Sequence, residues 1–360
     1  MPAWSTAAWC AFAAAVFAIS ASCTWGAIAY AHRRKLFDHP GQRRSHRVPT
    51  PRGGGIGIVA GLLFAMAALA TAASAPTRTV AWSVFAAVAV VGAVGWIDDH
   101  RSLPARVRLL AQAAALAVVF ATLAAGLGIE GVAAWLLLAC AAALPALLLL
   151  WSINLHNFMD GIDGLLALQA LFVLGTLSAL SAQAGHVAQG AVLATFALAV
   201  AGFAPFNFPR ARIFMGDVGS GVVGLAIGLA VAWQVATPGV AAASGFVLCS
   251  AFATDATCTL LARMLLGRRW YSAHREHLYQ WLVRCGHSHA RVVAYYMGWN
   301  FLIVLPVVIF INRPLAGHVG PAPSGIGAAL ALFAGAAILW WQGRRWCLRH
   351  VRTRRRHAAA

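Results

Sequence analysis

The carboxylate side chains are the residues of this chain best suited to chemistry, because its 360 residues include only nine of them. Asp98 and Asp99 are adjacent and follow a long apolar run. Two neighbouring carboxylates repel each other, so at least one gains from a cation, a proton or an arginine partner. The pair therefore indicates a metal ligand together with a general base. The alternative is a structural pair at a membrane interface, neutralised by Arg101 or Arg106.

A second polar motif, NLHNFMDGIDGL, carries an amide or a carboxylate at every third position: Asn154, Asn157, Asp160 and Asp163. On a helical turn these side chains would share one broad face. The glycines of the motif let the backbone approach a ligand closely. Amides and carboxylates together suit a nucleobase, a sugar or a hydrated metal ion. An ordinary turn before a helix is the alternative interpretation.

The segment NFPRARIFMGDVGSG places Asp217 at an expected helix start. Free N–H groups at such a start bind phosphate, and Mg²⁺ prefers a few carboxylates plus phosphate oxygens. Asp217 is therefore the first candidate for a metal ligand. Phe214 either stacks on a base or packs as a buried interface aromatic. Asn207 and Arg212 are further candidate substrate-binding residues, although Arg210 and Arg212 could equally be charges that set membrane topology.

A histidine-containing region follows, with HREHLYQ at its centre. His274 and His277 would be neighbours on a helical turn. No cysteine or acid lies at a zinc-binding spacing, and magnesium rarely takes imidazole. We therefore expect His274, Arg275 and His277 to bind phosphate. His287 and His289 are expected to be surface residues.

The loop KLFDHPGQRRSHRVPTPRGGG is strongly basic and holds seven basic residues when Arg33 and Arg34 just before it are included. This density fits a clamp for a pyrophosphate or a lipid phosphate. A plain topology signal is the alternative.

These motifs lie between long apolar segments, because 61% of the residues are hydrophobic, 10% are charged and the mean hydropathy is +0.76. A bilayer core needs about 20 apolar residues per helix, so the sequence predicts an all-α, polytopic membrane protein of about 10 to 11 helices. The expected spans are 3–31, 54–74, 80–97, 107–128, 132–153, 164–184, 188–206, 218–237, 240–266, 292–312 and 324–342. They form a single integral-membrane domain over residues 1–343, followed by a basic cytoplasmic tail over 344–360. Asp255 falls inside a span, where a buried interhelical hydrogen bond is expected.

The basic residues predict the orientation, because cytoplasmic loops hold the excess of Lys and Arg. With a periplasmic N-terminus, only Arg78 and Arg313 of the 27 Lys and Arg residues fall outside. The C-terminus and five polar segments are then cytoplasmic: 32–53, 98–106, 154–164, 207–217 and 267–291. These segments hold seven of the nine acids, and such a one-sided face favours an enzyme. A transporter or flippase for an anionic lipid-linked substrate is the alternative from another class, although polar groups on broken helices at the midplane are typical of it.

Five motifs in order, DHPGQRRSHRVPTPRGGG, DDHRSLP, NLHNFMDGIDGL, ARIFMGDVGSG and HREHLYQ, together resemble the polyprenyl-phosphate N-acetylhexosamine-1-phosphate transferases of bacterial glycosyltransferase family 4. That superfamily also contains the phospho-N-acetylmuramoyl-pentapeptide transferases. The resemblance implies a multi-pass enzyme of the bacterial inner membrane that depends on Mg²⁺, or on Mn²⁺ in its place. Such an enzyme transfers an N-acetylamino-sugar 1-phosphate from a UDP-sugar to undecaprenyl phosphate and releases UMP. The resemblance implies no nucleic-acid partner and leaves a homodimer open.

The motifs and the resemblance together give a set of candidate site residues. The catalytic candidates are Asp98, Asp99, Asp160 and Asp163; the metal ligands are Asp217 and Asp99; and the substrate-binding candidates are Arg47, Asn154, Asn157, Asn207, Arg212, Phe214, His274, Arg275 and His277. By resemblance, Asp98 or Asp99 would be the base acting on the lipid phosphate, and Asp217 would hold Mg²⁺ on the pyrophosphate. His277 matches the histidine of the family's last motif, and Arg47 stands where the peptidoglycan branch has a functional lysine.

Two departures from the family pattern favour the branch that initiates O-antigen or related surface glycans. Ser102 stands at the third acid of DDxxD, so no metal role is expected there. In the last motif, His274 replaces a common acid, and Tyr279 and Gln280 replace a histidine pair. The donor sugar stays open among N-acetylglucosamine, N-acetylfucosamine and N-acetylquinovosamine, and the peptidoglycan activity is the alternative. A CDP-alcohol phosphotransferase is disfavoured, because no Ala-Arg pair follows the DG of the second motif.

Overall fold

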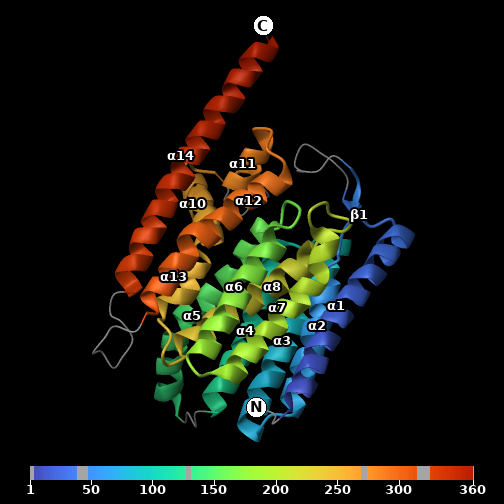
Figure 1. The fold of residues 1–360 in the computed structure, drawn as a ribbon, viewed down its shortest axis with the longest axis vertical. Helices are drawn as coiled ribbons and strands as arrows, with labels where there is room; N and C mark the ends of the chain where they lie inside the picture. Colours follow the sequence, from blue (N-terminus) through green and yellow to red (C-terminus); the bar gives the residue numbers. More distant parts are fainter. Residues whose placement is uncertain (1–3, 39–47, 127–130, 269–273, 314–324, 360) are drawn as a thin grey trace.

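The computed structural model describes residues 4–38, 48–126, 131–268, 274–313 and 325–359, and they form a bundle of long helices (Figure 1). Within these residues nine helices are long and apolar enough to cross a membrane, and a shorter apolar helix spans Ile56–Thr71. The prediction of an all-α polytopic protein is confirmed. Arg47 lies outside the described residues.

The elements follow one another in the order expected from the apolar segments. They are α1 (Thr6–Arg34), β1 (Phe37–Asp38), β2 (Thr50–Pro51), α2 (Ile56–Thr71), α3 (Ala75–His100), α4 (Ala105–Gly126), α5 (Val132–Met159), α6 (Leu165–Gln183), α7 (Val187–Asn207), α8 (Gly216–Val235), α9 (Ala243–Leu248), α10 (Ser250–Leu265), α11 (Leu278–Arg284), α12 (His289–Trp299), the π-helical turn η1 (Asn300–Val304), α13 (Leu305–Ile311) and α14 (Gly325–Ala359).

Two expected spans differ in detail from the observed helices. The span expected over 240–266 is divided into α9 and α10, which meet at Cys249. The span expected over 292–312 contains η1 just before Pro306. Proline has no N–H to donate to the carbonyl one turn earlier, and a π turn accommodates that missing bond. Helix α14 continues without a break through residue 344 and projects beyond the rest of the bundle (Figure 1).

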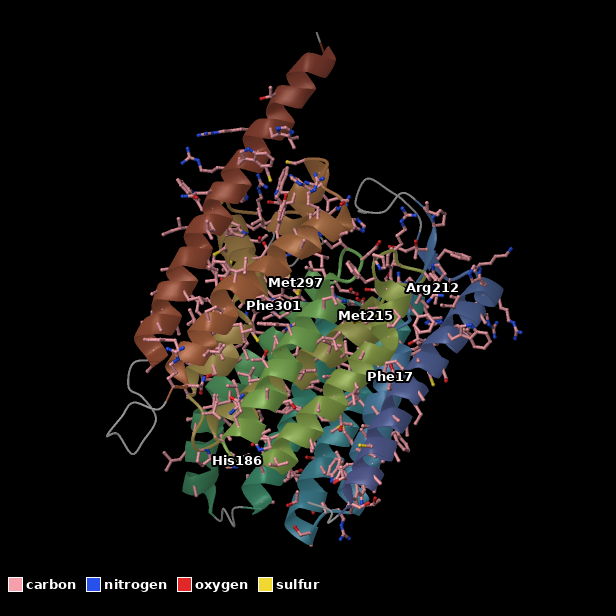
Figure 2. The ribbon with its side chains drawn as sticks, viewed as in Figure 1. Phe17, His186, Arg212, Met215, Met297 and Phe301 are labelled. Carbon is pink, nitrogen blue, oxygen red and sulfur yellow. The ribbon has the colours of Figure 1, made fainter. Side chains whose placement is uncertain are left out.

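The chain reverses direction at nearly every connection, so the ends of α1, α3, α5 and α7 lie at the same side as the starts of α2, α4, α6 and α8. Figure 2 shows Arg212 and Met215 near this side and His186 at the opposite end of the bundle. A two-residue antiparallel ladder, with Phe37 opposite Pro51, ties the end of α1 to the start of α2 on the first side. The polar motifs are thereby gathered at one end.

Helix α8 is the centre of this arrangement and packs against α2, α3, α5 and α6. Glycines permit unusually close crossings: a Cβ on Gly95 would lie 2.3 Å from the Asp217 carbonyl oxygen. A Cβ on Gly55 would lie 2.3 Å from the Gly219 Cα. No side chain fits at either point, so the backbones of α2 and α3 touch the first turn of α8. This contact brings the end of α3 next to Asp217.

Candidate active site

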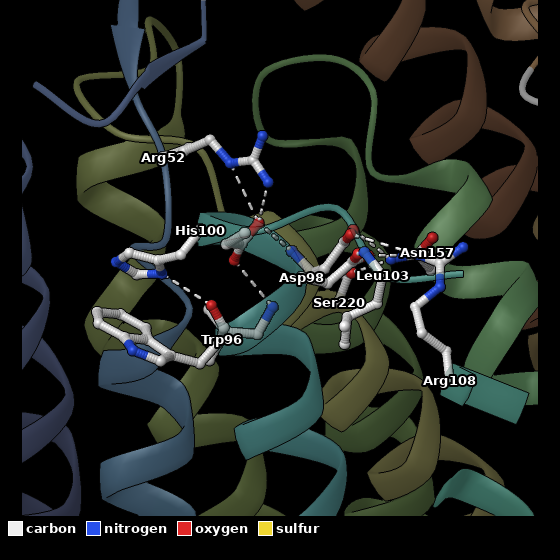
Figure 3. A network of polar contacts seen from close by, with 11 residues as sticks. Arg52, Trp96, Asp98, His100, Leu103, Arg108, Asn157 and Ser220 are labelled. Atoms are coloured by element: carbon white, nitrogen blue, oxygen red, sulfur yellow. Dashed lines mark hydrogen bonds and ion pairs between the residues drawn. The ribbon is translucent and has the colours of Figure 1, made fainter. Parts of the chain in front are cut away.

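Asp98 is held by groups that follow it in the chain (Figure 3). Its Oδ1 accepts a hydrogen bond of 2.6 Å from the Leu103 N–H, and its Oδ2 accepts one of 2.6 Å from Arg108 Nη1. The same Arg108 nitrogen lies 3.5 Å from Asp217 Oδ2. Arg108, in the first turn of α4, therefore lies between the carboxylates of α3 and α8. The sequence interpretation paired the aspartates with Arg101 or Arg106; in the structure their partner in this region is Arg108, two residues beyond Arg106.

Asp99 has a different set of partners, although it is the next residue. Its Oδ1 accepts from Arg52 Nε at 3.2 Å, from Arg52 Nη2 at 2.8 Å and from the Asp217 N–H at 3.0 Å. Its Oδ2 accepts from the Val218 N–H at 3.1 Å. The first N–H groups of a helix have no partner within the helix, and a carboxylate there is stabilised by the helix dipole. Asp99, only 4% exposed, thus caps α8 from another helix.

Asn157 and Asp160 complete the centre from the end of α5. Asn157 Nδ2 donates to Asp217 Oδ1 at 2.7 Å and to Ser220 Oγ at 2.9 Å (Figure 3). Asp160 is the residue after the last turn of α5. Burial, followed by the negative charges of Asp217 and Asp99, raises the pKa of Asp160 to about 8. Four carboxyl groups from three helix ends therefore face two arginines, and the Asp160 carboxyl is mostly protonated at pH 7.

The donor set fits a hard divalent cation. The acidic centre, which we define as Asp98, Asp99, Asn157, Asp160 and Asp217, offers oxygen atoms from carboxylates and an amide, and Mg²⁺ prefers oxygen ligands. Within the described part of the chain, no three His, Cys, Asp or Glu side chains are grouped as a complete metal site. Magnesium commonly uses one or two carboxylates and takes its other ligands from water and substrate phosphate. Asp99 accepts from four N–H groups and its side chain is 1% exposed, whereas Asp98 and Asp217 share the Arg108 side chain and the Asp217 side chain is 32% exposed.

The four polar side chains of the NLHNFMDGIDGL motif do not share one face, contrary to the helical expectation. Helix α5 ends at Met159, so Asp163 lies beyond it in the turn that leads to α6. Asn154 donates to Gln112 Oε1 of α4 at 2.9 Å. Asp163 Oδ1 lies 3.1 Å from His289 Nδ1 at the start of α12. Of the four, the structure brings Asn157 and Asp160 to the acidic centre.

Asn207 and Arg212 lie at the end of α7 and in the loop before α8, and their contacts stabilise this loop. Asn207, 3% exposed, accepts from the Gly164 N–H at 2.9 Å and donates to the Ile213 carbonyl at 3.0 Å. It therefore joins the turn after α5 to the loop before α8. Arg212 stacks its guanidinium 4.7 Å from the centroid of the Phe206 ring.

Phe214 is attached to the first loop through its backbone. Its N–H donates to the Pro51 carbonyl at 2.8 Å, and its carbonyl accepts from the Gly54 N–H at 2.9 Å. The Phe214 side chain is partly buried. The loop that carries Arg52 and the loop that precedes α8 are therefore joined directly.

The histidine region lies against the end of α5. His277, 2% exposed, is the N-cap residue of α11, and its ring stacks on Phe158 with centroids 6.1 Å apart. His274 lies 5.0 Å from His277 between ring centroids. Burial lowers the pKa of His277 to about 4, so its imidazole is neutral near pH 7. Arg275, between the two histidines in sequence, is partly buried.

Four residues that contact these candidates had not been singled out for such roles. Arg52 and Arg108 neutralise the aspartate pair, and Ser220 accepts from Asn157. His289 was expected at the surface; its side chain is 16% exposed and contacts Asp163. A usable signal existed for Arg108, because a basic residue in the first turn of the next helix can reach back to the end of the preceding one. No local pattern points from Asp163 to His289.

The fold and the site define a multi-pass membrane enzyme with an acidic centre at one end of its bundle. Comparison with known proteins agrees with this class. The family model for glycosyl transferase family 4 matches residues 81–234. That range extends from α3 to the end of α8 and contains Asp98, Asp99, Asn157, Asp160 and Asp217.

Curated relatives match over most of the chain. Decaprenyl-phosphate N-acetylglucosaminephosphotransferase of Mycobacterium leprae (strain TN) is 31% identical over 324 residues, covering 80% of this chain and 81% of the relative. The protein of the same name from Mycolicibacterium smegmatis is 32% identical, over 78% of this chain and 74% of the relative. A probable undecaprenyl-phosphate N-acetylglucosaminyl 1-phosphate transferase of Bacillus subtilis (strain 168) is 27% identical, over 74% of this chain and 75% of the relative. The chain belongs to the polyprenyl-phosphate N-acetylhexosamine-1-phosphate transferases of glycosyl transferase family 4.

Proposed function

We propose that this enzyme transfers N-acetylglucosamine 1-phosphate from UDP-N-acetylglucosamine to undecaprenyl phosphate, and so starts a lipid-linked surface glycan. The observation that carries the proposal is the convergence of Asp98, Asn157 and Asp217 around Arg108 at one end of the bundle. The names of the relatives support N-acetylglucosamine as the sugar. They leave the polyprenyl length to experiment, because decaprenyl and undecaprenyl acceptors both occur among them.

In the proposed reaction, an oxygen of the lipid phosphate attacks the sugar-bearing phosphorus of the donor. The bond from that phosphorus to the oxygen it shares with the UMP phosphate breaks, and UMP leaves with this oxygen. Asp98 accepts the remaining proton of an acceptor that is still protonated, since the second pKa of a phosphate monoester is about 6. Arg108 and Arg52 bind phosphate oxygens, because phosphoryl transfer depends mainly on positioning and on neutralising charge.

Magnesium is the cofactor we propose, and Asp217 would hold it. When bound, it would supply a charge that neutralises the pyrophosphate oxygens. Asp99, the other metal ligand expected from sequence, is better placed to hold α8 and Arg52. We expect EDTA to abolish transfer and Mg²⁺ or Mn²⁺ to restore it, measured as lipid product in purified protein. Full activity after exhaustive chelation would contradict a divalent-metal enzyme.

We propose that the site faces the cytoplasm of a bacterial cell. The five segments that meet at the acidic side are those expected inside by the charge distribution. A nucleotide-sugar donor is made in the cytoplasm, so it would reach this side directly. Arg52, in the described part of the basic first loop, pairs with Asp99 on this side and would meet the same anionic reactants.

The direct test offers purified protein a panel of UDP-N-acetylamino sugars with undecaprenyl or decaprenyl phosphate. The lipid product is then weighed by mass spectrometry. We expect product with UDP-N-acetylglucosamine, formed together with one equivalent of UMP. Asp217→Asn is the matched control and should give no product. Absence of any lipid-linked sugar from the wild type with every donor would overturn the proposed function.

A further inference from the structure

Asp255, in α10, is a buried carboxylate outside the acidic centre. It is 2% exposed, and it binds the start of α11. Its Oδ1 accepts from the Leu278 N–H at 2.7 Å, and its Oδ2 accepts from the Tyr279 N–H at 3.3 Å. The first N–H groups of a helix have no intrahelical partner. Asp255 therefore anchors a seven-residue helix that is too short to be stable by itself.

Three more groups hold the Asp255 carboxylate in place. Tyr296 Oη of α12 donates to Oδ2 at 2.7 Å, and Trp340 Nε1 of α14 donates to Oδ1 at 2.9 Å. Thr259 Oγ1, one turn along α10, donates to Oδ1 at 3.2 Å. Five donors from four helices thus converge on one side chain. The sequence expectation of a buried interhelical hydrogen bond for Asp255 is confirmed, with more partners than expected.

Tyr279 connects the Asp255 network to the acidic centre. Its hydroxyl donates to the Phe158 carbonyl at 2.9 Å, in the last turn of α5. A Cβ built on Gly161 would lie 2.1 Å from the same hydroxyl oxygen. The hydroxyl therefore touches the chain on both sides of Asp160. Burial raises the pKa of Tyr279, so this hydroxyl stays protonated and remains a donor.

His277 is fixed by the same short segment. Its Nδ1 lies 3.9 Å from Asp255 Oδ1, and its ring is stacked between Phe158 and Tyr279. From this geometry we propose that Asp255 is a positioning residue, which holds His277 and Tyr279 against the turn that carries Asp160. The consequence for catalysis rests on the proposed function, because it requires Asp160 and His277 to meet the substrates.

If Asp255 had a merely structural role, substitutions in its network would lower the thermal stability without altering the turnover of the folded protein. The two cases are separated by a matched pair of substitutions. Tyr279→Phe removes the hydroxyl that contacts Phe158, on the side of the acidic centre. Tyr296→Phe removes a hydroxyl from the same buried network, on the side of α12. We expect Tyr279→Phe to lower kcat about tenfold, as expected for one lost hydrogen bond, and Tyr296→Phe to change kcat less than about threefold.

Asp255→Asn tests the anchor itself. Asparagine keeps one acceptor oxygen and replaces the other with an NH2 group, so one of the two α11 N–H groups loses its acceptor. We therefore expect kcat to fall about tenfold, consistent with the loss of one such bond. The segment keeps a second attachment in this variant, because Glu276 pairs with Arg263 of α10. Combined with Tyr279→Phe, the loss should be clearly less than the product of the single losses, since both act on one connection. Independent, multiplicative losses would overturn the proposal.

Gly161→Ala examines the same contact from the other side. The new methyl group would collide with the Tyr279 hydroxyl, so kcat should fall. In a Tyr279→Phe background the collision is relieved, and Gly161→Ala should then cost much less. The comparison of Gly161→Ala in the two backgrounds still tests the proposal if Asp255→Asn does not fold. Equal effects of Gly161→Ala in both backgrounds would count against the contact.

Hydrogen exchange by mass spectrometry provides a readout that does not need turnover. Peptides covering residues 155–164 should exchange faster in Tyr279→Phe and Asp255→Asn than in wild type or Tyr296→Phe. Unchanged exchange there would overturn the positioning role. An inactive wild type that still shows this exchange pattern would contradict the proposed function and leave the positioning role standing.

Discussion

At the level of single residues, Asp98 and Asp99 differ in what surrounds them. Asp99 is enclosed by Arg52 and by two N–H groups of α8. Asp98 shares Arg108 with Asp217, whose side chain is about a third exposed. The two adjacent carboxylates can therefore have different roles. Asp99 stabilises the structure of the site, and Asp98 takes part in the proposed reaction. Substitutions should separate these two roles.

Asp217→Asn should abolish transfer, with kcat falling by about a thousandfold or more, as in other losses of transition-state charge stabilisation. Its thermal midpoint should stay near that of the wild type, because the Asp217 side chain is about a third exposed. Asp99→Asn should reduce activity and also lower stability by about 1–3 kcal/mol, since it leaves buried N–H groups unsatisfied. Lipid-product assays and thermal unfolding in detergent measure both. An Asp99→Asn protein of unchanged stability would contradict the capping role.

His277 gives stability a dependence on pH. Its folded pKa is lowered to about 4 from an ordinary value of 6.5, so the unfolded chain takes up the proton first. The contribution of neutral His277 is complete above pH 6.5 and is lost as the pH falls toward 4. Between pH 7 and pH 5 the loss should be about 2 kcal/mol.

Thermal unfolding of the wild type and of His277→Asn, compared at these two pH values, measures this loss. Asparagine can still cap α11 but does not titrate. The variant should therefore show a smaller decrease in its midpoint between the two pH values. Identical decreases in both proteins would mean that other groups account for the pH dependence.

At the level of elements, the site depends on how closely α3 approaches α8. The backbone at Gly95 touches the Asp217 carbonyl, and the distance allows no side chain. The position of Asp98 and Asp99 relative to Asp217 is therefore set by a glycine one turn before them. The length of α5 also affects the site. Because α5 ends at Met159, Asp160 lies just outside the helix.

Gly95→Ala should separate the end of α3 from the start of α8 and reduce both stability and transfer. We expect a loss of about 1–3 kcal/mol in stability, typical of overpacking, and at least a tenfold lower kcat, consistent with misplaced catalytic groups. Gly175→Ala in α6 is the control, because no atom lies within 4 Å of its added Cβ. Thermal unfolding midpoints and kcat values of both variants test this expectation. Equal behaviour of the two would show that the α3–α8 crossing does not control the site.

At the level of the whole molecule, the acidic centre, the histidine region and the described part of the basic loop lie at one side of the bundle. The opposite side carries the connection between α6 and α7, with His186 (Figure 2). Such asymmetry suits an enzyme whose soluble donor and lipid acceptor meet at one membrane surface. It also makes the membrane orientation directly testable.

Fusions to a fluorescent protein and to alkaline phosphatase should report opposite locations at the two sides. A fluorescent protein after Ala360 should be bright, and phosphatase there should be inactive, because its disulfides form only outside the cytoplasm. Phosphatase fused after Gly185, in the connection between α6 and α7, should be active. The reverse pattern would place the site outside the cytoplasm and exclude a cytoplasmic nucleotide-sugar donor.

The sequence by itself determined the helical membrane architecture, the family and most of the acidic centre. Hydropathy is a property of each segment alone, so membrane spans can be predicted without knowing how the helices pack. The motifs around Asp98, Asn157 and Asp217 are local in the same sense. Their gathering at one side followed from the alternation of the spans.

Only the tertiary structure decided which partners these residues have. Asp99 binds N–H groups 118 and 119 positions away, and Asp163 contacts a histidine 126 positions away. The role of Asp255 likewise depends on donors from α11, α12 and α14. Such contacts arise from helix crossings and glycine-sized approaches between distant segments. No property of one segment encodes them, and the packing of the whole bundle was needed to show them.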